Sequence, residues 1–236
     1  MDETIGLRLI EDLKNDPEKF CHDGKKSYQL LQEYFNGLSK DTLRELFHFE
    51  NKFIRQYAIW ITSELGRKGT DLLKEVVPLI NDSDYYINYH AMQIVAGHAN
   101  GKYFDEFITV ISFLEHSDPQ IRLSVMHIIS GLSGSRIHEA YAYLANKKNL
   151  SNSHEKGLLS LTDVNALNLS EITQMVVSDI AIIRKYGIIA AKKLYKKYPQ
   201  IINEAVNNAD EDVRGFSKWM TASRHNSGRS PDDETL

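Results

Sequence analysis

The sequence predicts an all-α protein, a right-handed superhelical solenoid of about five to six stacked helical hairpins. Five segments align on an aliphatic residue, and successive aligned positions lie 33, 34, 62 and 30 residues apart, of which 62 is two periods of 31. Arginine follows the aliphatic residue in four of the five segments. Three residues before it, four segments carry Asn or Asp, which cap helix N-termini. The aligned aliphatic residues are Ile54, Ile87, Ile121, Ile183 and Val213.

Each aligned segment is predicted to be the second helix of its hairpin. Compact side chains four residues after the aliphatic residue, and apolar ones seven residues after it, fall on one helical face. The segment aligned on Ile183 departs from this capping pattern, since Ile180 stands at the capping position and Asp179 comes one residue early. The four expected capping residues are Asn51, Asp84, Asp118 and Asp210.

An amphipathic segment precedes each of these helices and is predicted to be the first helix of the hairpin. A hairpin that cannot bury its own apolar face buries it by stacking on the next copy, which is why such units form arrays. The stretch Ser135–Thr162 has the length of a missing copy but lacks its signature, so we expect two irregularly packed helices there. The five first helices are expected at Asp41–Phe47, Thr70–Ile80, Tyr103–Leu114, Ser170–Ser178 and Tyr198–Asn207.

The two ends of the chain are predicted to differ from the repeats. Residues 1–40 are expected to form an N-terminal cap of one or two helices with a polar break at His22–Lys26. The repeats then occupy residues 41–222, around one continuous core. Residues 223–236 have almost no apolar content and are expected to be a disordered tail.

Composition limits the classes of function. In 236 residues, 42% are hydrophobic and 25% charged, which is ordinary for a soluble globular protein. The formal net charge of −4 does not favour nucleic acid or an anionic membrane surface. Cys21 is the only cysteine, so neither an internal disulfide nor a cysteine zinc cage is possible. The start of the chain lacks the pattern of a signal peptide and no stretch is apolar enough for a membrane span, so we expect a cytoplasmic protein.

Catalytic signatures are absent from the sequence. None of the nine histidines belongs to an H-E-x-x-H pattern, which would place two imidazoles on one helix face for zinc. There is no glycine-rich phosphate loop. We therefore expect no enzyme activity, no metal and no cofactor, and we assign Cys21 a structural role.

The segment DPQIRLSVMHIISGL, Asp118–Leu132, resembles the HEAT-like repeat family. The resemblance covers roughly residues 41–222 with a degenerate copy near 152, and the short spacing resembles the phycobilisome-lyase-like branch of this armadillo-type family better than the roughly 40–47 residues of other HEAT and armadillo repeats. It implies that second helices line a concave inner side. It also implies a ladder between repeats, in which Asn88 replaces one arginine, formed by Asp84, Asp118, Arg122, Arg184, Asp210 and Arg214.

The positions that point away from the buried face of each second helix are predicted to bind a partner. At 100° per residue these are offsets two, six and nine from the aliphatic residue. They carry aromatic side chains and few charges, a composition typical of protein interfaces. Alternatively, the two tryptophans pack under the N-terminal cap or the tail, because large aromatics are mostly buried. The partner-binding candidates are Gln56, Trp60, Tyr89, Gln93, Leu123, His127, Lys185, Ile189, Lys192 and Trp219.

A basic stripe runs from Arg184 to Lys197, with six basic residues and no acid. It could hold phosphate or an acidic protein, with Lys185, Lys192 and Lys196 on one outward face. The interpretation that the sequence favours is a solvated helix whose lysines interact with the negative end of the helix dipole.

These observations predict a non-enzymatic module that binds a partner protein through the concave face. Small HEAT-like proteins without catalytic motifs resemble bacterial adaptors or toxin-neutralising immunity proteins, which would imply a basic toxin domain as partner. The alternative is a nucleic-acid-binding protein of the alkylpurine DNA glycosylase type. The sequence lacks the tryptophan–tryptophan–aspartate cluster of that family, and its charge is wrong for a duplex binder.

Overall fold

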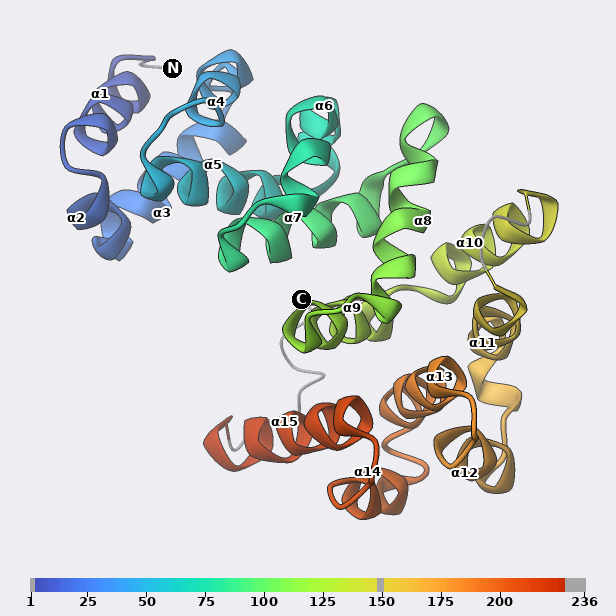
Figure 1. Ribbon diagram of the computed structural model, residues 1–236. Coiled ribbons are helices and arrows are strands. Elements are labelled where there is room, and N and C mark those ends of the chain that lie inside the picture. The colour runs from blue at the N-terminus through green and yellow to red at the C-terminus, as the bar shows by residue number, and fades with distance from the viewer. Residues whose placement is uncertain (1–2, 148–150, 228–236) are drawn as a thin grey trace. The chain divides into compact units, whose positions relative to one another are not determined.

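A computed structural model describes residues 3–147 and 151–227, and within these the side chains of residues 5–147 and 151–222. The described residues form helices and no strand, in agreement with the predicted all-α class. The chain divides into two compact units, unit 1 (Met1–Glu106) and unit 2 (Phe107–Leu236), and the boundary falls within α8 (Phe104–Ser112). Contacts concentrate within each unit, and Figure 1 shows the chain. One continuous core along the repeats stays a prediction.

Unit 1 begins with three helices where one or two were expected. Asp16 caps the second of them and Pro17, which has no N–H to donate, occupies its first turn, so the chain breaks once more than predicted. Asp23 then caps the third helix, inside the expected break. Two hairpins follow, and the first helix of the second hairpin is mostly 3₁₀. The elements are α1 Glu3–Asn15, α2 Pro17–His22, α3 Gly24–Phe35, α4 Lys40–Leu46, α5 Lys52–Leu65, η1 Gly66–Leu72, α6 Leu73–Val76, η2 Val77–Asn81, α7 Tyr85–His98 and η3 Gly101–Tyr103.

Unit 2 contains four helical hairpins, formed by α8 with α9, α10 with α11, α12 with α13, and α14 with α15. The pair α10 and α11 occupies the stretch where two irregularly packed helices were expected, so the presence of two helices there is confirmed. The elements are α8, η4 Phe113–Glu115, α9 Pro119–Gly131, α10 Gly134–Lys147, α11 Asn152–Thr162, η5 Val164–Ala166, α12 Leu169–Val176, α13 Ala181–Lys193, α14 Pro199–Ala205 and α15 Glu211–Ser227.

The predicted capping residues begin the second helices as expected. The side chain of Asn51 accepts a hydrogen bond from the backbone N–H of Phe53 at 2.9 Å, and that of Asp118 accepts one from Gln120 at 2.8 Å. Asp84 and Asp210 cap α7 and α15 in the same way. These bonds satisfy backbone donors that the first turn of a helix leaves unpaired.

The apolar face predicted for the second helices is buried. Of the five aligned aliphatic residues, Ile54, Ile87 and Val213 are buried, whereas Ile121 and Ile183 are half-buried. The positions four and seven residues later are buried in every copy, namely Ala58, Ile61, Ala91, Ile94, Val125, Ile128, Gly187, Ala190, Ser217 and Met220. The hairpin repeat is thus confirmed, and the handedness of a superhelix stays a prediction.

The repeated arginine has a role that the resemblance did not imply. In each of the four copies its Nη1 donates to backbone carbonyls five or six residues earlier, in the turn that enters the second helix. Arg55 donates to Phe49 and Glu50, for example, at 2.9 and 2.8 Å. Asn88 substitutes by donating from Nδ2 to the carbonyl of Ile80. The arginine therefore fixes the turn within its own hairpin. The other three copies are Arg122, Arg184 and Arg214.

The expected ladder between repeats is present at one step and altered at two others. Arg184 donates from Nε to Asp210 Oδ2 at 2.7 Å, as expected. Arg122 donates instead to Asp212, at 2.8 Å. Asp84 accepts from the amide of Gln56 and not from an arginine. The pairing therefore depends on local geometry as well as on the repeat position.

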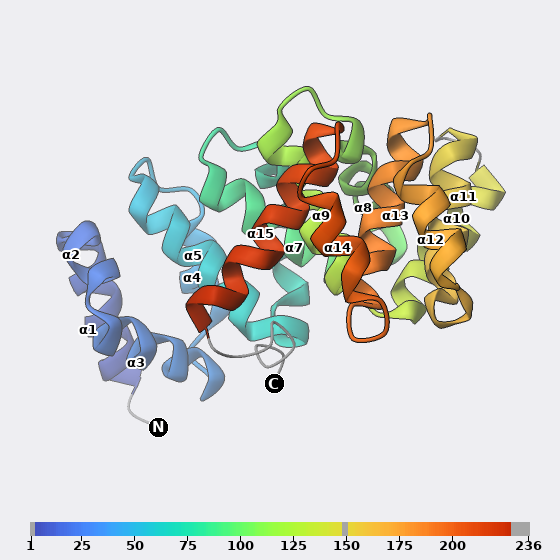
Figure 2. The same ribbon diagram turned by 90° about the horizontal axis from the view of Figure 1, so that it is seen from below.

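The second helices of unit 2 pack on one another. Helices α9, α13 and α15 are mutually in contact, and α11 also packs on α13 (Figures 1 and 2). Behind them Tyr186 is fully buried, with its hydroxyl 3.0 Å from His154 Nδ1, and His154 Nε2 lies 3.2 Å from Glu115. The ring of Tyr186 presses against Gly157, where any side chain would collide with it.

Helix α15 continues through Ser227, so Ser223–Ser227 are helical where the disordered tail was expected to begin. The tail itself stays a prediction. The remainder of the predicted tail, residues 228–236, lies outside the described residues.

Candidate binding pocket in unit 1

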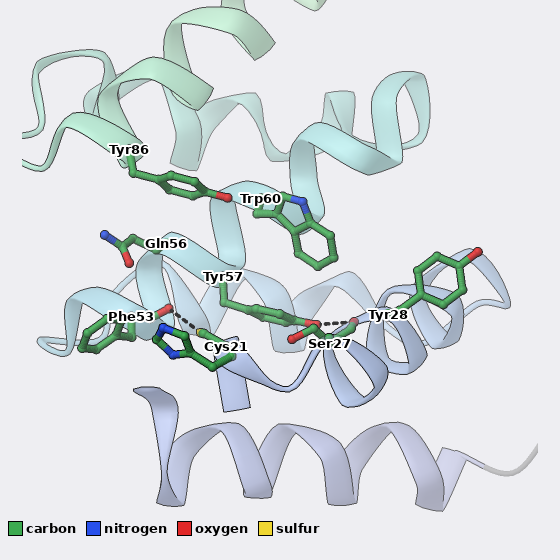
Figure 3. A pocket seen from close by; sticks show the side chains of 10 residues that line it. Cys21, Ser27, Tyr28, Phe53, Gln56, Tyr57, Trp60 and Tyr86 are labelled. Atoms are coloured by element: carbon green, nitrogen blue, oxygen red, sulfur yellow. Dashed lines mark hydrogen bonds between the residues drawn. The ribbon is translucent and has the colours of Figure 1, made fainter. Parts of the chain in front are cut away.

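A pocket of about 510 Å³ opens in unit 1 between the N-terminal helices and the first two second helices, α5 and α7 (Figure 3). This volume suits a small molecule or one large side chain. Among the described residues, none of those that line the pocket is Asp, Glu, Lys or Arg. The lining residues are Cys21, His22, Gly24, Ser27, Tyr28, Phe53, Gln56, Tyr57, Trp60 and Tyr86.

Tyr57 forms the fixed base of this pocket. Its hydroxyl donates to the carbonyl oxygen of Ser27 at 2.6 Å, which ties α5 to α3. Its ring meets Phe20 edge to face at 5.4 Å between centroids, and Trp60 at the same distance with a 50° tilt. Aromatic pairs in these geometries are favourable beyond the area they bury. Trp60 is thereby held half-buried at the pocket wall.

Cys21 and His22 close one end of the pocket. The Cys21 thiol donates to the carbonyl of Phe53 at 3.6 Å, and burial raises the pKa of this thiol to about 11. A thiol with a raised pKa is a poor nucleophile, which agrees with the structural role expected for it. The Nδ1 of His22 lies 2.7 Å from the carbonyl of Glu18, which can only accept, so Nδ1 carries the proton.

Two tyrosines line the more exposed part of the pocket. Tyr28 is 62% exposed and Tyr86 is 41% exposed, although most exposed side chains of this protein are polar. Neither hydroxyl has a hydrogen-bond partner among the described residues. Burial raises the pKa of Tyr86, with further contributions from Cys21 and from the carboxylate of Glu64. Exposed aromatic rings with available hydroxyls are characteristic of binding surfaces.

Two of the predicted partner-binding residues belong to this pocket, Gln56 and Trp60. The Gln56 amide also donates to Asp84 Oδ2 at 2.8 Å, which links the pocket wall to the cap of α7. Tyr89 is half-buried beside Tyr85 and His90, and Gln93 is exposed on α7, but neither lines the pocket.

Two predicted partner-binding residues of unit 2 are buried, and their assignment to an outward face is wrong. Lys185 is only 5% exposed, and its Nζ donates to the carbonyl of Leu114 and lies 3.0 Å from Asp212. Ile189 is completely buried. The positions that point away from the first helices here face α9 and α15, because the second helices of unit 2 pack on each other.

The remaining predicted residues of unit 2 lie on the same closed face. His127 stacks on Trp219 with 3.8 Å between ring centroids and also contacts Phe216. Leu123 is half-buried, and Trp219 retains 36% exposure. Burial lowers the pKa of His127 to about 4, with a smaller contribution from the charge of Lys192. This face is mostly an internal contact.

Most of the basic stripe is engaged within unit 2. Lys192 donates to Ser130 Oγ at 2.8 Å and lies over the Trp219 ring. Lys193 donates to the carbonyl of Leu132 at 2.6 Å, and burial lowers its pKa to about 8. These lysines satisfy groups at the end of α9, where carbonyls lack helical partners. The expectation that Lys185 faces outward with Lys192 is therefore wrong.

Several pocket residues escaped the sequence analysis, namely Cys21, His22, Ser27, Tyr28, Phe53, Tyr57 and Tyr86. Offsets along a single helix could not find them, because the pocket joins α5 and α7 to the non-repeating N-terminal helices. The density of aromatic residues around Trp60 was the available signal.

Among the described side chains, those of residues 5–147 and 151–222, no cluster of three or more His, Cys, Asp or Glu is arranged to hold a metal ion. Likewise, none of the helices in this part of the chain has the length and apolar character needed to cross a bilayer.

No protein-family model and no curated protein matches this sequence. Solved structures of similar fold include armadillo and HEAT-like repeat proteins. One is a designed armadillo repeat protein in complex with the peptide (KR)4, with 11% identity, coverage of 92% of this chain and 96% of that chain, and a TM-score of 0.43. Another is the archaeal HEAT-like repeats protein from Thermococcus onnurineus NA1, with 14% identity, coverage of 93% and 95%, and a TM-score of 0.40.

Proposed function

We propose that this chain is a non-enzymatic protein-binding module and that the pocket of unit 1 receives a side chain of the partner. The observation that carries the proposal is the open pocket of about 510 Å³, in which the exposed rings of Tyr28 and Tyr86 accompany Trp60, whose ring contacts that of the buried Tyr57. Interfaces gain most of their binding energy from a few aromatic and arginine anchors in such pockets. Trp60 and Tyr86 are the residues most suited to this role.

The chemistry of the pocket favours binding over catalysis. Its one thiol has a raised pKa and is bonded to a backbone carbonyl, so it is not poised for nucleophilic attack. None of the lining residues is a carboxylate that could act as a general base beside it. An adaptor or a toxin-neutralising immunity protein would use such a surface, with a basic domain as its partner and the cytoplasm as its site of action.

Affinity capture from cells of the native source tests the proposal. The tagged wild-type chain, a Trp60→Ala/Tyr86→Ala variant and a Trp219→Ala variant are compared, with circular dichroism to verify folding. We expect the wild type and Trp219→Ala to retain the same protein, and the double variant to lose it. The captured protein is then titrated against each variant by calorimetry. Equal affinity for all three, or capture that nuclease treatment abolishes, would overturn the proposal.

A further inference from the structure

We propose that the unit 1 pocket binds the guanidinium group of an arginine side chain from a basic partner protein. The inference rests on the proposed function, because it names the chemistry of that partner. It follows from one juxtaposition, in which the rings of Trp60 and Tyr86 line the pocket and the exposed carboxylate of Glu64 follows Trp60 by one turn of α5.

The rings supply faces on which a planar cation can stack. The rings of Tyr57 and Trp60 contact each other, with 5.4 Å between their centroids, so the faces available for stacking are those of Trp60 and Tyr86, which Figure 3 shows above Tyr57. Guanidinium stacks on such faces and is more weakly hydrated than an ammonium group, so its desolvation costs less. Lys52 of the chain already lies over the Phe53 ring, 5.2 Å from its centroid, which leaves the other rings for an incoming cation.

Glu64 supplies the negative charge. It follows Trp60 by one helical turn on α5, so the two side chains share a face. It is exposed, and its charge helps to raise the pKa of the Tyr86 hydroxyl, after the larger effects of burial and of Cys21. Among the described residues it has no ion-pair partner. A carboxylate in this state can accept a charge-assisted hydrogen bond from a guanidinium.

The polar groups inside the pocket also suit a ligand that only donates hydrogen bonds. Because His22 Nδ1 donates to Glu18, the Nε2 atom of the neutral ring is an acceptor. The hydroxyls of Tyr28 and Tyr86 can accept as well. Arginine has five donors and no acceptor. An anionic ligand, by contrast, would find no lysine or arginine among the lining residues.

The charge of unit 1 would attract such a partner. Residues 1–106 contain 18 acidic and 13 basic side chains, a formal net charge of −5, whereas residues 107–236 contain 14 and 15, a net charge of +1. The negative charge of the chain is therefore concentrated in the unit that holds the pocket. A field of this sign raises the association rate of basic partners.

The test uses the full chain with Trp219→Phe, which leaves Trp60 as its only tryptophan. Fluorescence of Trp60 is followed during titration with acetyl-Gly-Arg-Gly-amide and with the same peptide carrying citrulline, which has nearly the same shape but no charge. We expect saturable binding of the arginine peptide, about tenfold tighter than the citrulline peptide. Glu64→Gln in this background should weaken arginine binding about three- to tenfold and leave citrulline binding unchanged.

Three results would overturn the inference. Equal affinity for the arginine peptide, the citrulline peptide and a further peptide that carries leucine at the same position would mean that the pocket takes apolar groups, and protein binding would survive. Tight binding of a DNA duplex that displaces the arginine peptide would favour a nucleic-acid ligand instead. If no peptide binds, the arginine inference is wrong, and the proposed function is also wrong only if Trp60→Ala/Tyr86→Ala still captures the partner.

Discussion

The second helices of the two units differ in what covers the positions that point away from their first helices. In unit 1, α5 and α7 face the short N-terminal helices, and a pocket lined by rings such as Trp60 and Tyr86 remains between them. In unit 2, α9, α13 and α15 contact one another, and the equivalent positions Lys185 and Ile189 are buried. The same repeat pattern thus gives an open face in one unit and a closed face in the other. What faces the second helix decides whether its outward positions are available to a partner.

The buried ion pairs of unit 2 give the largest expected difference. Asp212 accepts from Arg122 at 2.8 Å and from Lys185 at 3.0 Å, and all three are mostly buried. Asp212→Ala leaves two cations without a counter-charge and should lower the free energy of unfolding by about 3–5 kcal/mol, measured by urea denaturation. In unit 1, Asp71 also holds two cations but is 47% exposed, so Asp71→Ala should cost about 1 kcal/mol or less. Equal losses would contradict the difference between the two faces.

The same carboxylate makes a prediction about acid stability. Burial by itself raises the pKa of Asp212, but the hydrogen bonds from Arg122 and Lys185 outweigh it and hold this pKa below its usual value. Because the folded-state pKa is depressed, the stabilisation is present above about pH 4, the unfolded value, and is lost as the pH falls below it. Asp212→Asn should therefore lose stability at pH 7 but show a flatter profile below about pH 4. A profile parallel to the wild type would contradict this assignment.

Two glycine substitutions test how tightly unit 2 is packed. A Cβ on Gly157 would lie 2.0 Å from the ring of Tyr186, which is fully buried and bonded to His154. Gly157→Ala should therefore lower the melting temperature, with a loss of about 1–3 kcal/mol. On α15, a Cβ on Gly215 meets nothing within 4 Å, so Gly215→Ala should be neutral or stabilising. Similar melting temperatures for both variants would mean that α11 does not pack on α13 as described.

The buried histidines His127 and His90 are expected to have a smaller effect on the pH dependence of stability. Burial, with a minor contribution from Lys192, lowers the pKa of His127 to about 4, so between about pH 6.5 and 4 the unfolded chain binds more protons than the folded one. The free energy of unfolding should therefore decrease as the pH is lowered through this window. The variant His127→Gln should remove on the order of 1 kcal/mol per pH unit of that decrease. His90→Gln in unit 1 should act similarly, because burial lowers its pKa to about 4 as well. If His127→Gln leaves the slope unchanged while His90→Gln reduces it, α15 does not cover His127.

The repeat could be predicted from the sequence because its signals are local. The caps Asn51 and Asp118 and the spacing of the buried face depend only on residues within one helix. The candidate site could be predicted from the sequence only in part. Trp60 was found by its offset, but Tyr28 belongs to a helix outside the repeat, and the burial of Ile189 depends on how α9, α13 and α15 meet. Contacts between elements distant in sequence leave no periodic trace.

The most direct test of the open and closed faces is a map of backbone amide shifts by nuclear magnetic resonance during titration with acetyl-Gly-Arg-Gly-amide. The perturbed amides should lie at Tyr28, Gln56, Trp60, Glu64 and Tyr86, with those of α9, α13 and α15 unchanged. Shifts concentrated on α13 and α15, with none around Trp60, would contradict the account.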